Sequence, residues 1–360
     1  MATYYVTTSG SDSNNGLTEG TAFATPGYAA GQATTSGDIV YVKEGTYTLT
    51  STSANVSGGT LSISQSVRFE GYKTTIGDTA ARPVIHAGTQ VVTNVIYFDN
   101  PLYNRRQTAA ISIEVDGNGN ATNGFYQRVN YNSVVYDCIA RNCTNGFYGG
   151  QQNGFNYGCA AYDCTGYGFH GGSPIYCLAE GCLYGFGGPS ASSTILEVFG
   201  CIAANCTGTG FNLNNALGSA IYKCIAYGNG GEGFFVNYDV CQHHQCISVN
   251  NSGYGYRIYG GSGADAFMTD CADYNNANGR LNNTLSAQTD FRPINLTGDP
   301  FTSASTGDFT LNNNAGAGAE LRQIQLSGLA GVNSVFDVGA IDAVVTPGGG
   351  GSTLHPLYAN

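Results

Sequence analysis

A repeat of about 22 residues, running from Val134 to Gly279, constrains the fold of this chain more than any other feature. A cysteine begins each copy, and consecutive copies start 21, 18, 24, 23, 22 and 25 residues apart. These cysteines are Cys138, Cys159, Cys177, Cys201, Cys224, Cys246 and Cys271. A regular period of this length is typical of a protein built from stacked, similar units.

Further columns recur inside the copies. In the first six copies a small residue, alanine or serine, lies two positions after the cysteine, and a Gly-aromatic pair follows eight or nine positions after it. Five positions after the cysteine, every copy has cysteine or asparagine. Small residues alternate with β-branched and aromatic ones, which is the period of a strand. Each copy is therefore predicted to contain short strands separated by turns.

We predict an all-β fold, a right-handed single-stranded parallel β-helix whose coils of about 22 residues each contain three short strands. Equivalent side chains then stack from coil to coil. Tyr136, Cys138 and Ala140 are expected to alternate along one strand and to point inward. The column of Cys and Asn five positions after each cysteine is expected to be an inward ladder at a turn, where Asn amides hydrogen-bond to one another.

Composition limits the partners. The chain has 24 Asp plus Glu against 13 Lys plus Arg, and no basic run. We therefore expect no binding to nucleic acid or to an anionic membrane. We find no transmembrane run and no signal peptide, so we expect synthesis in a cytoplasm, unless a leader precedes this sequence.

All 12 cysteines lie between Cys138 and Cys271. In a large repeat protein we expect buried free thiols that act as small apolar residues, with disulfides between stacked thiols as the alternative. Zinc is disfavoured because cysteines five apart fall on different strands of a coil. We predict no metal and no cofactor.

The N-terminal 50 residues are predicted to form a cap. A strand at Tyr4–Val6 leads into a turn-forming loop, and Thr25 and Pro26 are a helix N-cap and first helical position. The short helix that follows, through Ala33, is expected to cover the first coil, because an open apolar end invites edge pairing.

This N-terminal region and the C-terminal part of the chain resemble the pectate-lyase-like β-helix superfamily. The matching residues are Tyr4-Tyr5-Val6, Gly10, Asp12, Gly16, Pro26 to Ala33, Gly37-Asp38, Val40-Tyr41-Val42, Gly45, Tyr47, Asp299-Pro300-Phe301, Gly307 to Leu311 and Asp337 to Ile341. The resemblance implies the β-helix fold. It says little about function, because one fold hosts many chemistries.

We divide the chain into a cap (residues 1–50), a parallel β-helix (51–343) and a Gly-rich linker with a C-terminal tail (344–360). Residues 280–291 are expected to form a loop excursion. The tail carries Leu354, Leu357 and Tyr358, and it is either a frayed terminus or a peptide that docks on a partner.

No catalytic, cofactor-binding or metal-binding residue is predicted. Enzymes of the superfamily cut acidic polysaccharides and need carboxylates roughly 5–10 Å apart, and the hydrolase motifs that the resemblance implies are absent from this sequence. The nearest acidic pair is Asp239 with Asp265, joined by His243. We expect His243 to be exposed and its neighbour His244 to point inward.

The main functional hypothesis is a non-catalytic structural or adhesive β-helix, most specifically a decoration or fibre protein in the virion of a virus of bacteria, assembled in the host cytoplasm. Its partners would be other virion proteins, contacted through Leu354, Leu357 and Tyr358, and a surface glycan. The sequence does not decide between a monomer and a homo-oligomer. The alternatives are a polysaccharide lyase or glycoside hydrolase, such as a virion depolymerase, and a carbohydrate-binding rod that is secreted or at a cell surface.

Overall fold

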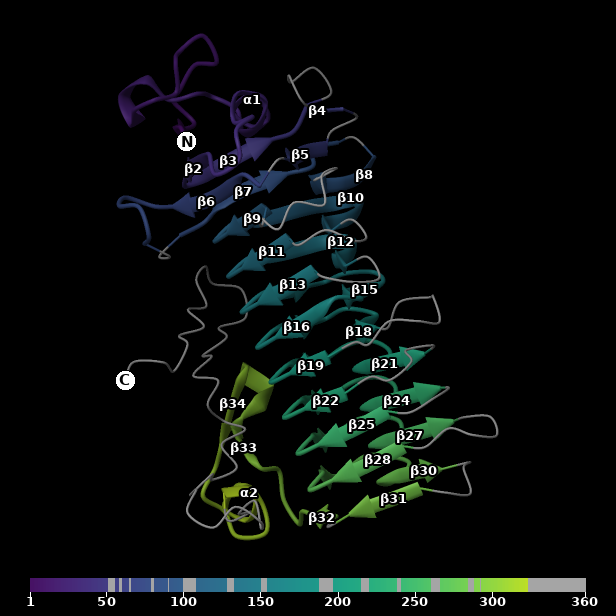
Figure 1. Cartoon of the computed structure of the whole chain (residues 1–360). Helices are drawn as coiled ribbons and strands as arrows, with labels where there is room; N and C mark the ends of the chain where they lie inside the picture. Colours follow the sequence, from purple (N-terminus) through teal and green to yellow (C-terminus); the bar gives the residue numbers. More distant parts are fainter. Residues whose placement is uncertain are drawn as a thin grey trace. The chain divides into compact units, whose positions relative to one another are not determined.

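The computed structural model describes residues 1–50, 56–57, 60–64, 66–78, 81–89, 91–99, 108–127, 133–149, 154–187, 197–214, 220–237, 241–259, 266–283, 288–291 and 293–322. The chain divides into two compact units, Met1–Pro189 (unit 1) and Ser190–Asn360 (unit 2). Each unit is a stack of β coils (Figure 1). The predicted boundaries at residues 50 and 343 stay a prediction.

In unit 1 each coil contributes strands to three parallel sheets (Figure 1). The first sheet contains β1 (Thr3–Val6), β2 (Ile39–Lys43), β6 (Arg68–Tyr72), β9 (Thr108–Ile111), β11 (Ser133–Tyr136), β13 (Gly154–Tyr157) and β16 (Ser173–Ile175). The second contains β3 (Gly45–Thr48), β7 (Pro83–His86), the first parts of β10 (Glu114–Gln127) and β12 (Ile139–Gly149), β14 (Ala160–Tyr162) and β17 (Leu178–Glu180). The third contains β5 (Thr60–Ser64), β8 (Val92–Asp99), the later parts of β10 and β12, β15 (Tyr167–His170) and β18 (Tyr184–Gly187), while β4 (Val56–Ser57) pairs antiparallel with β5.

Unit 2 repeats the same three-sheet plan. Its first sheet contains β19 (Glu197–Phe199), β22 (Ala220–Tyr222), β25 (Cys241–His244), β28 (Ala266–Thr269) and β31 (Gln288–Phe291). The second contains β20 (Ile202–Ala204), β23 (Ile225–Tyr227), β26 (Ile247–Val249), β29 (Ala272–Tyr274) and β32 (Ile294–Asn295), and the third β21 (Phe211–Asn214), β24 (Phe234–Asn237), β27 (Tyr256–Tyr259) and β30 (Leu281–Asn283).

Few of the described residues lie outside these coils. Unit 1 has a 3-10 turn, η1 (Glu19–Thr21), and a helix, α1 (Pro26–Gln32), whose N-cap Thr25 accepts a hydrogen bond from the Tyr28 amide at 3.2 Å. The helix contacts β1, β2 and β5 at the N-terminal end, as predicted for the cap (Figure 1). Unit 2 ends in the antiparallel hairpin β33 (Phe301–Ser303) and β34 (Asp308–Leu311), joined by η2 (Ala304–Thr306), and the short helix α2 (Gly318–Arg322).

The predicted ladders fill the interior of each unit. In unit 1, Phe125, Phe147 and Phe169 stack with ring centroids 4.9 and 4.6 Å apart and nearly parallel planes. In unit 2, Phe211, Phe234 and Tyr256 stack at 4.7 and 5.1 Å. The cysteines that begin the copies, and the alanines two positions later, are also buried. All 12 cysteines are free and buried, which agrees with the free-thiol prediction.

The glycine before each aromatic residue has a packing role. A Cβ added to Gly146 would lie 2.8 Å from the Gly168 carbonyl oxygen and 2.9 Å from the Ala161 Cβ. Only glycine fits so close to the next coil, which explains why Gly accompanies the aromatic column.

The prediction that Tyr136, Cys138 and Ala140 share one strand and one face is wrong. Asp137 has φ +52°, a left-handed conformation that ends β11 and turns the chain into β12. Tyr136 is 36% exposed, whereas Cys138 and Ala140 are fully buried. The turn residue inverts the alternation, so the residue two before each cysteine points outward.

The prediction of a loop excursion over residues 280–291 is also wrong in part. Leu281–Asn283 forms β30 and Gln288–Phe291 forms β31, each paired in parallel with the preceding coil. The repeat therefore continues for one coil beyond the region where its sequence columns are clear.

Candidate functional site

Five charged side chains gather on the second sheet of unit 1 and at its edge, in a chain with only 10% charged residues. We call this group the charged cluster. It consists of Arg82, Glu114, Asp116, Asp137 and Arg141. Glu114 and Asp116 begin β10, and Asp116 is in register with Arg141 of the next coil.

Arg82 and Asp137 form the buried half of the charged cluster. The Arg82 Nη2 donates to Asp137 Oδ1 at 2.5 Å, and its Nε donates to the Asp137 carbonyl oxygen at 2.9 Å. The Ser112 hydroxyl donates to Asp137 Oδ2 at 2.8 Å. The two charged side chains are 5% and 13% exposed. This pair ties the segment before β7 to the turn that begins β12.

Glu114 and Arg141 form the more open half. The Arg141 Nε lies 2.7 Å from Glu114 Oε1, and the two side chains are 37% and 18% exposed, in that order. Burial raises the pKa of Glu114, although Arg141 and Arg82 act in the opposite direction. The Arg141 guanidinium also lies 5.8 Å from the centre of the Tyr162 ring.

Asp116 connects the charged cluster to a turn. Its Oδ1 accepts hydrogen bonds from the Asn118 amide at 2.8 Å and from Asn142 Nδ2 at 3.0 Å. Beside it lies an open polar hollow of about 410 Å³ that crosses three coils. The hollow is lined by Asn118, Gly119, Asn142, Cys143, Thr144, Asp163 and Thr165.

The charged cluster combines a carboxyl group that holds its proton to higher pH than usual with a partly exposed guanidinium. A carboxyl group with a raised pKa keeps its proton more readily than an ordinary one and can donate it, and a guanidinium binds carboxylates. The arrangement therefore places a carboxyl group with a raised pKa beside a partly exposed cation.

Unit 2 has a similar pair on its third sheet. Arg257 Nη1 donates to Glu232 Oε1 at 2.7 Å, and Thr209 donates to Glu232 Oε2 at 3.2 Å. The Arg257 guanidinium lies 5.5 Å from the centre of the Phe235 ring. Outward charges thus pair between adjacent coils in both units.

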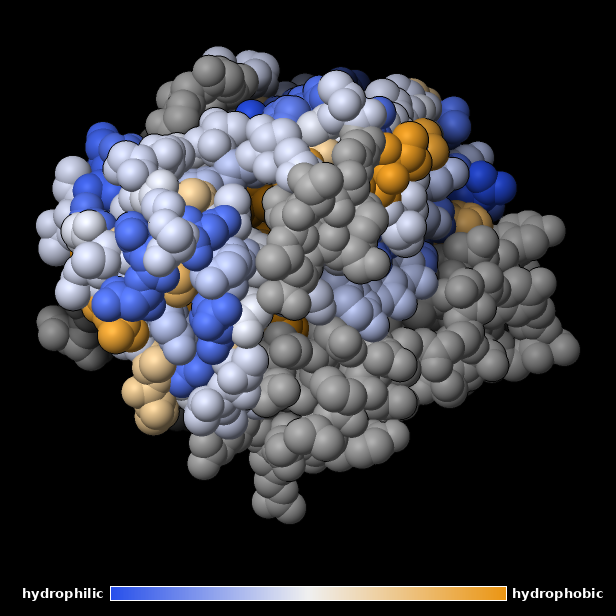
Figure 2. All heavy atoms as spheres, turned by 90° about the horizontal axis from the view of Figure 1, so that it is seen from above, coloured by the Kyte–Doolittle hydropathy of each residue, from blue (hydrophilic) through white to orange (hydrophobic). Residues whose placement is uncertain are grey.

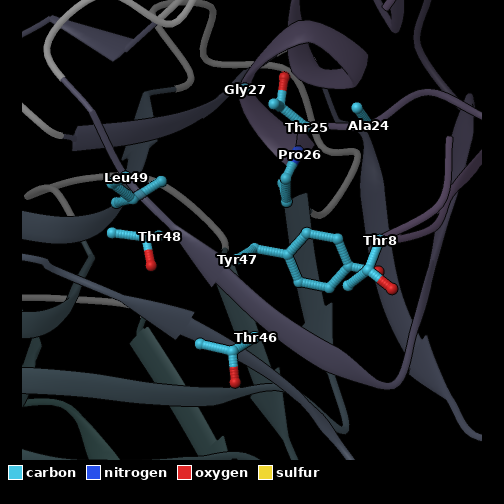
Figure 3. A pocket seen from close by; sticks show the side chains of 9 residues that line it. All are labelled: Thr8, Ala24, Thr25, Pro26, Gly27, Thr46, Tyr47, Thr48 and Leu49. Atoms are coloured by element: carbon cyan, nitrogen blue, oxygen red, sulfur yellow. The ribbon is translucent and has the colours of Figure 1, made fainter. Parts of the chain in front are cut away.

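A smaller hollow of about 180 Å³ lies in the cap of unit 1 (Figure 3). Figure 3 shows Thr25 and Pro26 of the helix start on one side, and Thr46, Tyr47 and Thr48 of β3 on the other. The Tyr47 hydroxyl donates to the Lys43 carbonyl oxygen at 2.8 Å, and burial, then Tyr72, raises the Tyr47 pKa. The hollow is part of the packing between cap and first coil.

The loop between Gly10 and Gly16 serves the same packing. Asp12 accepts hydrogen bonds from the Ala24 and Thr25 amides at 2.9 and 3.0 Å and from the Thr25 hydroxyl at 2.8 Å. The carboxylate thus fixes the loop to the start of α1. Seen from above, the described surface is mostly hydrophilic or intermediate, with separate hydrophobic areas (Figure 2).

The acidic pair singled out in the sequence, Asp239 with Asp265, lies outside the described residues.

The prediction for the two histidines is wrong. His243 is fully buried, whereas His244 faces outward and stacks on Tyr222 at 5.1 Å. His244 does share the aromatic column, as expected, but the left-handed turn at Gln245 puts that column on the outer face.

The sequence also failed to indicate the charged cluster. Glu114 and Arg141 belong to adjacent coils, but the columns that align coils begin only at Cys138. Aligning Val115 with Ala140 as inward residues would have shown the pair. Arg82 and Asp137 are 55 residues apart and had no such signal.

Within the ranges that the structure describes, no three His, Cys, Asp or Glu side chains form a group that suits a metal ion. No helix in the same ranges is long and apolar enough to span a membrane.

Comparison of the sequence with protein-family models and with curated proteins gave no match. Solved structures do match. The pectate lyase Pel9A aligns with a TM-score of 0.55 at 16% identity, covering 94% of this chain and 96% of that protein. This chain has the pectate-lyase-like parallel β-helix fold.

A second match is ORF18 of Geobacillus virus E2, with a TM-score of 0.50 at 15% identity. The alignment covers 75% of this chain, and the chain spans 56% of the length of the viral protein. Identities this low establish the fold alone.

Proposed function

We propose that this β-helix is a structural component of the virion of a virus of bacteria, attached to the particle through residues 344–360. The observation that carries the proposal is that charged side chains on the outside of the coils form ion pairs with one another along the stack. Arg141 with Glu114 and Arg257 with Glu232 pair between adjacent coils, and Arg82 with Asp137 pairs across two coils. Such pairing is expected to stiffen the stack of coils within each unit. The fold shared with ORF18 of Geobacillus virus E2 supports the viral setting.

Two further features support this proposal. The twelve free thiols suit assembly in a reducing cytoplasm. The sequence Pro347 to Gly351 has the glycine-rich composition of a linker, and the apolar Leu354, Leu357 and Tyr358 follow it. A short apolar peptide on such a linker suits docking to another virion protein.

Co-sedimentation tests the proposal. The full chain, a chain ending at Thr346 and the matched variant Leu354→Ser/Leu357→Ser/Tyr358→Ser are each expressed in infected host cells. We expect the full chain to sediment with particles and both altered chains to stay free. Sedimentation of all three with particles argues against the tail anchor, and a free full chain argues against the virion assignment.

A second candidate is an enzyme that degrades an acidic polysaccharide, and the raised pKa of Glu114 beside Arg141 favours it. The coverage of both chains in the match to Pel9A is consistent with it. The test is release of new chain ends from acidic polysaccharides by the wild type, Glu114→Gln and Glu232→Gln. Glu232 is the matched control, because it also lies 2.7 Å from an arginine and its side chain is also 18% exposed. Loss in Glu114→Gln alone supports the enzyme, whereas an inactive wild type or equal activity of all three opposes it.

A further inference from the structure

His243 is an exception in the interior of unit 2. It occupies the inward column of the first sheet, in register with Ile221 of β22 and Met268 of β28. All three side chains are fully buried. An imidazole therefore replaces an apolar side chain in the middle of an apolar column.

Neither ring nitrogen of His243 has a hydrogen-bond partner within the described ranges of the chain. The ring meets the Phe234 and Tyr256 rings edge to face, at 5.6 and 6.0 Å between centroids. A neutral imidazole always carries one N–H, so burial here leaves a donor and an acceptor unpaired. An apolar residue would suit packing better, which indicates a role other than static stability.

Among the residues that the structure describes, the groups around His243 offer no compensation for a positive charge. Cys241 and His244 belong to β25 itself, and Cys246 lies between β25 and β26. The Cys271 thiol, between β28 and β29, donates to the His243 carbonyl oxygen at 3.5 Å, and the Tyr256 ring of β27 meets the imidazole edge to face. The Tyr256 hydroxyl already donates to the Cys246 and Ala272 carbonyl oxygens at 2.8 and 3.0 Å. The Arg280 guanidinium lies 5.7 Å from the centre of the Tyr256 ring, and Asp273 pairs with Arg280 at 2.6 Å. Burial lowers the pKa of His244, and the charge of Asp270 acts against that shift. The pKa of His243 is lowered by burial and by His244, without a contribution from Asp270.

We infer that His243 makes the β22–β25–β28 stack of unit 2 an acid-sensitive latch: it holds the coils closed while neutral, and its protonation requires the stack to open. The ring is too deeply buried to accept a proton from water in the closed coil. Acid therefore acts on the open form: it protonates His243 there and shifts the equilibrium toward the open stack. This inference is independent of the virion assignment and of the enzyme alternative.

The direction of the effect follows from linkage. Burial, and to a smaller extent His244, lowers the pKa of His243 from its ordinary value of 6.5 to about 3. A base with a lowered pKa in the closed state binds its proton more readily in the open state. Its contribution to closure is complete above the open-state pKa near 6.5 and is lost as the pH falls from there toward 3. In this window, each fall of one pH unit raises the ratio of open to closed stack about tenfold.

Hydrogen–deuterium exchange of the full chain between about pH 4 and pH 7 tests the latch. Opening constants, corrected for intrinsic exchange, are compared for amides of β25 and β28 and for amides of β11 and β13 in unit 1. We expect opening of β25 and β28 to increase about tenfold per pH unit below 6.5, and opening of β11 and β13 to change much less.

Two substitutions separate the latch from general acid instability. His243→Met, which matches Met268, is expected to remove the pH slope, with His243→Leu as the second choice if that variant does not fold. His244→Gln changes the adjacent, half-buried histidine and is expected to retain the slope. A slope that survives in the folded His243 variant, or a wild type without a slope, overturns the inference.

Discussion

The side-chain Nδ2 of Asn251 donates a 2.8 Å hydrogen bond to Oδ1 of Asn276, directly beneath it in the next coil. Asn229 donates to Asn251 Oδ1 in the same way, also at 2.8 Å. Asn251 Nδ2 also contacts the Ala226 carbonyl oxygen at 3.2 Å, and all three asparagines are buried. This ladder confirms the inward Asn column predicted from the sequence.

Asn251→Ala is expected to lower the free energy of unfolding by about 3 kcal/mol, the upper end of the cost of leaving a buried polar group unpaired, because neighbours on both sides lose a partner. The measurement is urea unfolding followed by circular dichroism. Asn251→Cys is the control, since Cys206 occupies the same column one coil before Asn229. We expect it to lose less, and equal stability of all three proteins would show that the amide ladder contributes little.

The success of that prediction and the failure at the histidines have one explanation. Columns such as Phe147 and Asn251 could be predicted because the same residue type returns at each coil. The left-handed turn before each cysteine is occupied by Asp137, Tyr176 and Lys223, among others, which share no chemical type. The turn at Asn142 and Asp163 uses only residues that tolerate positive φ, so it does leave a signal. Where no residue type recurs at the turn, the sequence does not reveal the turn. The inward and outward side chains of the preceding strand are then assigned wrongly.

The charged cluster could not be predicted for a different reason. The Arg82–Asp137 pair joins residues 55 positions apart, outside the region of clear repeats. Only the stacking of the coils brings them together. Charge positions in a solenoid become predictable only after every coil has been aligned.

Lys223 has φ +53°, although only glycine adopts this region without cost. Relief of the left-handed conformation is worth about 1–2 kcal/mol, and the extra freedom of glycine in the unfolded chain costs about 0.5–1 kcal/mol. Lys223→Gly is therefore expected to raise the unfolding free energy by about 0.5–1 kcal/mol.

The matched control for Lys223→Gly is Gly228→Ala, at φ +63° in the other turn of the same coil. Its new Cβ would lie 2.9 Å from Asn205 Oδ1, so this variant is expected to lose stability. Both values come from chemical unfolding. A destabilised Lys223→Gly variant would mean that the lysine side chain contributes more than its backbone costs.

Arg82→Met is expected to destabilise unit 1 by about 3–5 kcal/mol, because it leaves the Asp137 carboxylate buried without its cation. Adding Asp137→Asn removes the stranded charge, so the double variant is expected to regain part of the loss. A double-mutant cycle measured by chemical unfolding gives the coupling between the two residues. Additive losses would show that the pair is not coupled.

The cysteine ladders predict almost complete protection of the thiols in the native protein. All twelve are buried, and burial raises the pKa of Cys138, Cys143 and Cys241 to about 12. Since the thiolate is the reactive form, only about one such thiol in ten thousand is ionised at pH 8. Ellman's reagent at pH 8 is therefore expected to label none of the twelve within minutes in buffer and all twelve in guanidinium chloride. A denatured count below twelve would reveal a disulfide, and rapid labelling of the native chain would show that the coils open far more often than their packing indicates.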